Sequence, residues 1–437
     1  MSAQGTRDTD LLDSSKPYMA GTKRISIASL KPGMFVVGMD QPWYKTPFLF
    51  HKRLVGSDAD INLLRRHGIQ EVLIDPTKGL DLEEPVASDP PSSAPSTPPP
   101  TSDHAAPSDI DIARARTKTA RAAYGEAMKA LERVLDELEG GNPATIPILR
   151  KVVANVLKRI MDHPLSMLTQ FCVQKMQAFD RTLASHATDV CVLSLIVAQE
   201  MSGIQTNQEE LGIGALLHDA GYLRLPRNLY RKARELSGHE RSLMQQHPQL
   251  AATVIAQGSA GVLSEHVRRI IVEHHERLDG SGFPQGLSGD ALLMAGQLVG
   301  LVDAYDGMVS WRAERAPLLP HDAIRQLFIL GEKGRFDKSL VEVTIKALGV
   351  YPVGSLIRLN TGERAIVVGI HAEHRLKPTV KIISGPQGES YREPLVVDLT
   401  HSAPGQPPRT ILRALDPRQE QVKVSEYFEA ACEGTPR

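Results

Sequence analysis

The side chains of this sequence that could do chemistry are histidines and aspartates placed beside apolar, helix-like segments. An apolar run ends directly in His218 and Asp219. Burying an imidazole and a carboxylate is costly unless each is paired or binds a cation. One such pair would also fit a satisfied ion pair, so the interpretation depends on its companions. These companions are His186, His247, His274, His275 and Asp303. Imidazoles and carboxylates that converge from several helices form the ligand set of a transition-metal site.

Apolar periodicity indicates the elements that would position these groups. His186 recurs at helical spacing with apolar residues, which places it on the inner face of a helix. His247 precedes a proline, a position that disfavours helical geometry, so it is predicted at a junction. Adjacent residues on a helix diverge by about 100°. The doublet His274-His275 is therefore predicted to serve two neighbouring metals better than to chelate one.

A glycine-rich loop at residues 279–284 follows the doublet. Its glycines permit close approach of the backbone to a ligand. Phe283 in this loop is interpreted with equal weight as a base-stacking ring or as packing. The next helical segment carries Asp303 and Asp306. Asp306 either orients a metal ligand or packs between helices, and the first interpretation is favoured.

Composition bounds the class of protein. The chain has 437 residues, enough for two or three domains, and its 41% hydrophobic and 23% charged residues are ordinary for soluble globular proteins. A net charge of −1 argues against binding long nucleic acid by bulk charge but allows a small anionic ligand. Three scattered cysteines favour a reducing compartment over a disulfide framework. No apolar run approaches about 18 residues and the N-terminus is polar, so we expect a cytoplasmic protein without membrane insertion.

Strand and helix patterns near the N-terminus predict a small α/β module at residues 21–79, after a disordered lead-in at residues 1–20. Its strands are expected at 24–27, 35–37 and 71–75, and its helix at 58–67. Trp43 and the segment 46–50 either offer an aromatic surface to a partner or fill the small core, and the second is favoured. Residues 80–111 are rich in proline and serine, which predicts a linker.

The apolar periodicity of the rest of the chain predicts a mainly α protein. A connector at 112–164 contains two amphipathic helices separated by Gly140-Gly141. This pair could transmit a signal or dimerise, or it could pack on the core, and both interpretations stay open. An all-α core is expected at 165–349. Strand patterns indicate a small β appendage at 350–414, and residues 415–437 are expected to be a polar tail.

The order of these motifs resembles the HD-GYP subgroup of the HD phosphohydrolases. The similarity rests on His218-Asp219-Ala220-Gly221, on His247-Pro248, and above all on the block at 274–284. It covers residues 165–350. The stretch at 25–75 and the strands after residue 351 also resemble modules that accompany this subgroup.

The resemblance implies a bacterial enzyme that hydrolyses cyclic di-GMP to pGpG, and often on to GMP, with iron, manganese or similar ions. Asp219 is expected to bridge two metals and to form the catalytic pair with His218. Carried over by motif, the metal ligands are His186, His218, Asp219, His247, His274, His275 and Asp303. Some relatives hold a third metal with a Glu at the position of Thr182. Two divalent ions, Fe or Mn, are therefore expected, and such a pair suits an in-line phosphoryl displacement.

The expected substrate contacts depart from the usual pattern of the subgroup. Tyr222 stands where the family has a Lys that helps to hold a phosphate. Phe283 replaces the Tyr of the Gly-Tyr-Pro triplet, which keeps the ring and loses the hydroxyl. Two arginines downstream of Asp303 survive and suit phosphate oxygens. The predicted contacts are Tyr222, Gly282, Phe283, Pro284, Arg312 and Arg315.

Three functions are left open by this sequence. The first is a two-metal cyclic di-GMP phosphodiesterase, favoured because the ligand set is retained. The second, motivated by Tyr222 and Phe283, is a catalytically weak receptor or adaptor that binds the dinucleotide and signals through protein partners. The third keeps catalysis and changes the substrate to another cyclic dinucleotide or a linear one. Protein partners are expected through the N-terminal module, and a homodimer is possible.

Overall fold

The structure is a computed structural model, and the described residues form two compact units within Met1–Ala105 and Ala106–Arg437. The described residues are 22–39, 53–55, 58–66, 69–77, 79–80, 109–142, 146–177, 182–201, 207–226, 229, 236–258, 263–311, 316–371, 374–401 and 408–429. Predictions for the lead-in at 1–20, for Trp43 and residues 46–50, and for most of the linker lie outside these residues. Within the described part, no helix is both long and apolar enough to cross a membrane.

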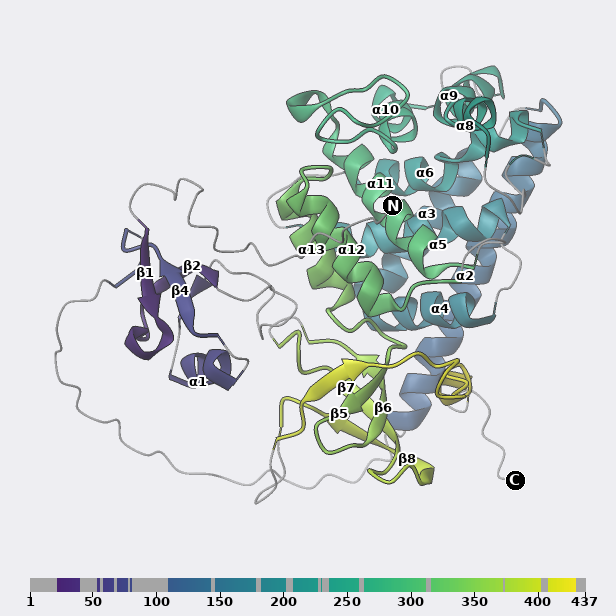
Figure 1. Ribbon diagram of the computed structural model, residues 1–437. Coiled ribbons are helices and arrows are strands. Elements are labelled where there is room, and N and C mark those ends of the chain that lie inside the picture. Colours follow the sequence, from purple (N-terminus) through teal and green to yellow (C-terminus); the bar gives the residue numbers. More distant parts are fainter. Residues whose placement is uncertain are drawn as a thin grey trace, which may run out of the picture. The chain divides into compact units, whose positions relative to one another are not determined.

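The first unit is a small antiparallel sheet with one helix (Figure 1). Its elements are β1 (Lys23–Ser26), β2 (Phe35–Met39), β3 (Arg53–Leu54), α1 (Asp58–Arg66) and β4 (Glu71–Ile74). The strand order is β1-β4-β2-β3. Alternation in β4 buries Val72 and Ile74, which join Leu64 of α1 in one core. The sequence did not predict β3, because two residues are too few to show a strand period.

The second unit is built mainly from helices (Figure 1). Their bounds are α2 (Asp109–Glu139), α3 (Ile146–Asp162), α4 (Pro164–Gln177), α5 (Leu183–Gln199), α6 (Gln208–Leu217), α8 (Gly238–Met244), α9 (His247–Gly258), α10 (Glu265–Glu273), α11 (Met294–Val309), α12 (Pro320–Glu332) and α13 (Lys338–Leu348). The expected mainly α fold is confirmed.

The helix α5 lies at the centre of this unit and contacts α2, α4, α6, α11 and α13. Every residue from Ala187 to Ala198 is buried, which is the behaviour of a helix that is covered on all sides. Its N-terminus is capped by Thr182, whose hydroxyl accepts a hydrogen bond from the backbone N–H of Ser185 at 3.0 Å. Thr182 therefore caps the helix that carries His186.

The helices α2 and α3 pack on the core. Contacts join α2 to α4 and α5, and α3 to α6. Tyr124 and Leu131 of α2 are buried, as are Leu149 and Val153 of α3. The interpretation that these two helices pack on the core is confirmed, whereas signal transmission and dimerisation remain predictions. The chain turns after α2 at Gly141, which has a φ of +75°.

The C-terminal part of the second unit is a five-stranded antiparallel sheet in the order β8-β7-β6-β5-β9 (Figure 1). The strands are β5 (Leu356–Leu359), β6 (Arg364–Gly369), β7 (Thr379–Ser384), β8 (Ser390–Asp398) and β9 (Ile411–Ala414). Strand patterns at residues 355–359, 365–370 and 380–383 of the sequence predict the first three. They missed β8 and β9, which form the two edges of the sheet and show no regular alternation in burial.

The predicted polar tail from residue 415 needs correction. Leu415, Val424 and Phe428 are buried in one cluster with residues of β5, β6 and β7, and a short helix α14 spans Glu426–Glu429. Cys172 of α4 belongs to the same cluster, so the sheet packs on the helical core. The three apolar side chains are spaced too widely along a polar segment for periodicity to reveal them.

Candidate metal centre

Seven His and Asp side chains come together in the second unit and form two sets of possible metal ligands. The inner group contains Asp219, His247, His274 and His275, and the outer group contains His186, His218 and Asp303. Within each group the ligand atoms all lie within 4.8 Å of one another. Three of the four members of the inner group are buried, whereas two of the three in the outer group are partly exposed. All the predicted metal ligands are thus brought to one place.

Asp219 belongs to the inner group but also faces the outer group. Its Oδ1 is 3.2 Å from Nε2 of His247 and 3.7 Å from Nε2 of His274. Its Oδ2 is 3.2 Å from Nε2 of His186 and 3.4 Å from Nε2 of His218. Each oxygen therefore faces one group, which is the geometry required of a carboxylate that bridges two cations.

The backbone fixes the ring orientation of three histidines. Nδ1 of His218 lies 2.7 Å from the carbonyl oxygen of Ala215, and His247 and His274 make the same contact three residues back, at 2.7 and 2.6 Å. A carbonyl only accepts, so Nδ1 must donate, and whenever the ring is neutral Nε2 carries the lone pair. Each ring is thereby held in the tautomer that ligates a metal through Nε2.

This orientation leaves lone pairs that need a cation. Nε2 of His247 and Nε2 of His274 face each other at 3.2 Å, and both are acceptors once Nδ1 of each ring donates. Nε2 of His218 is buried and makes no aligned hydrogen bond within the described residues. Buried acceptors without donors are costly, and a cation among them removes that cost. The donor set therefore fits a bound metal.

Charge in the centre leads to the same conclusion. Burial opposes ionisation of Asp219, but His218 and neighbouring imidazoles hold its pKa well below the usual range. Burial lowers the pKa of His275 to about 3 and that of His274 well below its ordinary value. Burial also opposes protonation of His218, yet Asp219 and Asp303 raise its pKa to about 9. In the protein alone, a proton on His218 thus offsets buried carboxylates, and a cation would displace that proton.

Two glycines let the ligand-bearing segments meet. A Cβ on Gly221, just after Asp219, would lie 1.9 Å from the carbonyl oxygen of His247. A Cβ on Gly300, in α11, would lie 1.8 Å from the carbonyl oxygen of His274. Both positions therefore require glycine, because any side chain would push α9 or α11 away from the centre.

The prediction for the doublet was wrong in one respect. His274 and His275 both belong to the inner group, with ring centroids 4.1 Å apart. The expectation that they diverge by a helical step assumed a continuous helix. The helix α10 ends at Glu273, so His275 lies beyond it in a turn and its ring can converge with that of His274.

Glu276 is a buried carboxylate that sequence reasoning missed. Its Oε1 accepts the backbone N–H of Gln285 at 2.6 Å, and its Oε2 accepts that of Leu287 at 3.0 Å. A Cβ on Gly282 would lie 2.4 Å from the Cα of Glu276. The glycine-rich loop is therefore fastened onto the segment that follows the doublet. The available signal was an acidic residue directly after two ligand histidines.

The predicted substrate contacts lie against the inner group or outside the described residues. Tyr222 stacks on the ring of His247, with centroids 4.3 Å apart and an interplanar angle of 14°. The ring of Phe283 lies 4.5 Å from that of His275 and is tilted by 31°. Gly282 and Pro284 flank Phe283 in the fastened loop. Arg312 and Arg315 lie outside the described residues.

Asp306 is fully buried in α11, one helical turn after Asp303. Its Oδ2 lies 2.8 Å from Nδ1 of His186. The carboxylate thus does for His186 what backbone carbonyls do for the other three rings. Nε2 of His186 in turn lies 3.1 Å from Oδ1 of Asp303. The geometry places Asp306 as an outer partner of a ligand histidine.

Three domain families match consecutive parts of the sequence. A domain of unknown function (DUF3391) matches residues 22–147, an HD domain matches residues 166–340, and a KOW domain associated with HD domains matches residues 356–422. The HD match contains the entire His/Asp centre, so the part of the chain that carries this centre is similar to HD domains. The block from His274 to Pro284, on which the resemblance to the HD-GYP subgroup chiefly rests, lies within this match.

The curated relatives of this chain include phosphodiesterases of cyclic dinucleotides. A cyclic di-GMP phosphodiesterase of Pseudomonas aeruginosa is 29% identical over 381 residues, which are 86% of this chain and 89% of that protein. A cyclic di-GMP phosphodiesterase of Vibrio cholerae is 32% identical over 133 residues, 29% of this chain and 27% of that protein. A 3′3′-cGAMP-specific phosphodiesterase of Vibrio cholerae is 25% identical over 171 residues, 39% of this chain and 32% of that protein. The chain thus spans most of the first relative and about a third or less of the other two.

Proposed function

We propose that this protein is a metal-dependent phosphodiesterase that hydrolyses cyclic di-GMP at a two-cation centre. The observation that carries the proposal is the position of Asp219, with one carboxylate oxygen toward each ligand group. Two bound cations would supply the Lewis acidity for an in-line phosphoryl displacement. The relatives named as cyclic di-GMP phosphodiesterases support the substrate.

The residues of the chain have separate tasks in this proposal. Asp219 of the inner group and His218 of the outer group connect the two sets of ligands, and so hold together the region in which the reaction would take place. The partly exposed members His186 and Asp303 leave the outer group accessible from solvent. The loop fastened by Glu276 carries Phe283 beside the inner group, where its ring can contact a guanine base. Arg312 and Arg315 would neutralise phosphate oxygens.

Two cations, Fe or Mn, are the proposed content of the site. Imidazole and carboxylate ligands suit both metals. A third cation would need a further carboxylate one turn before His186, and Thr182 in that position caps α5. The further proposals of a cytoplasmic protein, of partners for the N-terminal module and of a homodimer rest on the sequence.

The test is hydrolysis by purified protein loaded with iron anaerobically, and with manganese in parallel. Cyclic di-GMP, 3′3′-cGAMP and pGpG are offered separately, and products are separated by chromatography. We expect metal-dependent turnover with cyclic di-GMP as the preferred substrate. His239→Ala serves as a control, because His239 is an exposed histidine outside both groups. Turnover that persists without metal, or only with 3′3′-cGAMP, would contradict the proposal.

A receptor function is the second candidate, and ring stacking favours it. Tyr222 packs on His247 and lacks the positive charge of the usual Lys, and Phe283 packs on His275 and lacks the phenol hydroxyl of the usual Tyr. Removal of one charge-stabilising donor typically costs 10²–10³ in rate, so about that loss is expected relative to a Lys at 222. Tyr222→Lys should then raise turnover without changing dinucleotide affinity by a comparable factor. Tight binding with no turnover in either form would favour the receptor.

A further inference from the structure

A largely buried lysine that belongs to no metal-binding motif lies next to the centre. Lys175, near the end of α4, has a side chain that is 13% exposed. Its Nζ is 2.5 Å from Oδ1 of Asp306, and the other oxygen of that carboxylate contacts Nδ1 of His186. Asp306 thus links Lys175 to His186 of the outer group.

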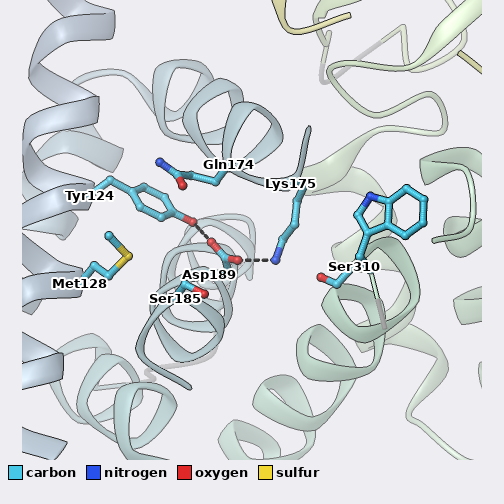
Figure 2. Close-up of a pocket in the computed structure, with 8 residues that line it drawn as sticks. Tyr124, Met128, Gln174, Lys175, Ser185, Asp189 and Ser310 are labelled. Carbon is cyan, nitrogen blue, oxygen red and sulfur yellow. Dashed lines mark hydrogen bonds and ion pairs between the residues drawn. The ribbon is translucent and has the colours of Figure 1, made fainter. Parts of the chain in front are cut away.

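The lysine is itself held from the opposite direction. Figure 2 shows Tyr124 of α2 and Lys175 of α4 reaching the carboxylate of Asp189 from two sides. The phenol hydroxyl of Tyr124 donates to Oδ1 of Asp189, and Lys175 donates to Oδ2. Tyr124 and Asp189 are both buried. A continuous chain of polar contacts therefore runs from α2 to α5, from α5 to α4, from α4 to α11, and from α11 to His186.

The pocket beside these residues is too small to explain them as a ligand site. It is lined by Tyr124, Lys175 and Asp189 among others, and its volume is about 20 Å³. That is room for roughly one water molecule. The buried lysine and its two carboxylates are better explained by what they position.

We propose that Lys175 is a positioning residue of the metal centre, which fixes Asp306 and through it the ring of His186. The lysine thereby sets the affinity of the outer group for its cation. This inference rests on the proposed function only in requiring that the two groups hold cations. Outer partners of ligand histidines typically change metal affinity by 10–100-fold when they are removed. The inner group has its own backbone contacts and should be unaffected.

The experiment is a Mn²⁺ titration of metal-free full-length protein, followed by metal content and electron paramagnetic resonance. Lys175→Met keeps the length of the stem and removes the charge. We expect outer-group affinity to fall by about 10–100-fold while the inner group binds as in the wild type. Limiting Mn²⁺ should then give the signal of an isolated ion instead of a coupled pair. His186→Ala and His247→Ala identify which group is which.

Controls separate positioning from folding. Lys381→Met removes another partly buried lysine, whose Nζ bonds the carbonyl of Tyr427 in the β appendage, and it should leave both affinities unchanged. Lys175→Arg restores a cation beside Asp306 and should recover part of the lost affinity. Tyr124→Phe removes only a hydroxyl, and it should weaken the outer group in the same direction by less. This variant keeps the test decisive if Lys175→Met fails to fold.

The outcomes distinguish the two proposals. Equal affinities in wild type, Lys175→Met and Tyr124→Phe would overturn the positioning role. So would a loss shared equally by both groups in a folded variant. A wild-type protein that binds two cations without hydrolysing any dinucleotide would contradict the proposed function alone. A wild-type protein that binds no cation would contradict both.

Discussion

The inner and outer groups of the metal centre are oriented by different parts of the chain. In the inner group, His247 and His274 are fixed by carbonyls three residues earlier. In the outer group, His218 is fixed in the same local way, but His186 is fixed by Asp306, 120 residues away in the sequence. Local backbone geometry persists when distant side chains change, whereas a network across four helices depends on each member. Substitutions elsewhere in the helical core should therefore affect the outer group more than the inner group.

Removal of Asp219 should have the largest effect, because this carboxylate serves both groups. Asp219→Ala is expected to lower cation content in both and to reduce turnover by at least about 10³-fold, the upper range for loss of one stabilising group. Metal analysis and hydrolysis of cyclic di-GMP give the two readouts. Retention of both cations in the folded variant would show that Asp219 does not bridge them.

A side chain at position 221 should disturb the inner group selectively. Gly221→Ala places a Cβ against the carbonyl of His247, and the forced shift should cost about 1–3 kcal/mol of stability. Denaturant unfolding and Mn²⁺ titration measure the two consequences. Gly125→Ala is the matched control, because a Cβ there meets nothing within 4 Å on α2 and should stabilise the protein by about 0.4–1 kcal/mol. If Gly221→Ala changed the free energy of unfolding as Gly125→Ala does, the close approach would be refuted.

The pH dependence of metal binding should differ between the groups. The pKa of His218 is about 9 in the metal-free protein, so a proton competes with the outer cation below that pH. Outer-group affinity should rise by about tenfold per pH unit from roughly pH 6 to pH 8 and level off above 9, with release of one proton. The inner rings His274 and His275 have lowered pKa values and are already neutral in this range. Titrations at several pH values would contradict this if both groups showed the same slope.

The smallest effect is expected in the loop. Glu276→Gln leaves only one acceptor oxygen for two backbone N–H groups, which should weaken the loop at residues 279–288 by about 1–3 kcal/mol. Hydrogen exchange in this loop should quicken and KM should rise, while the cation content of both groups stays at two. A fall in metal content would mean that the loop also supports the inner group.

The sequence was informative where function depends on residues close together in the chain. Most of the candidate metal ligands could be predicted because they lie at or near helix ends within short motifs, as His218 does after an apolar run, although Asp303 lies in the middle of α11. The contacts of His186 could not, since the pairing of Lys175 with Asp306 and Asp189 exists only after three helices pack. Edge strands such as β8 were missed for the related reason that an exposed strand needs no regular alternation of apolar residues.

The most direct test of the account is turnover of cyclic di-GMP measured against equivalents of Fe²⁺ or Mn²⁺ added to metal-free protein. The two-cation centre predicts little activity with the first equivalent and a steep rise with the second, because one cation alone cannot occupy both sides of Asp219. Full activity at one equivalent, or activity without any metal, would contradict it.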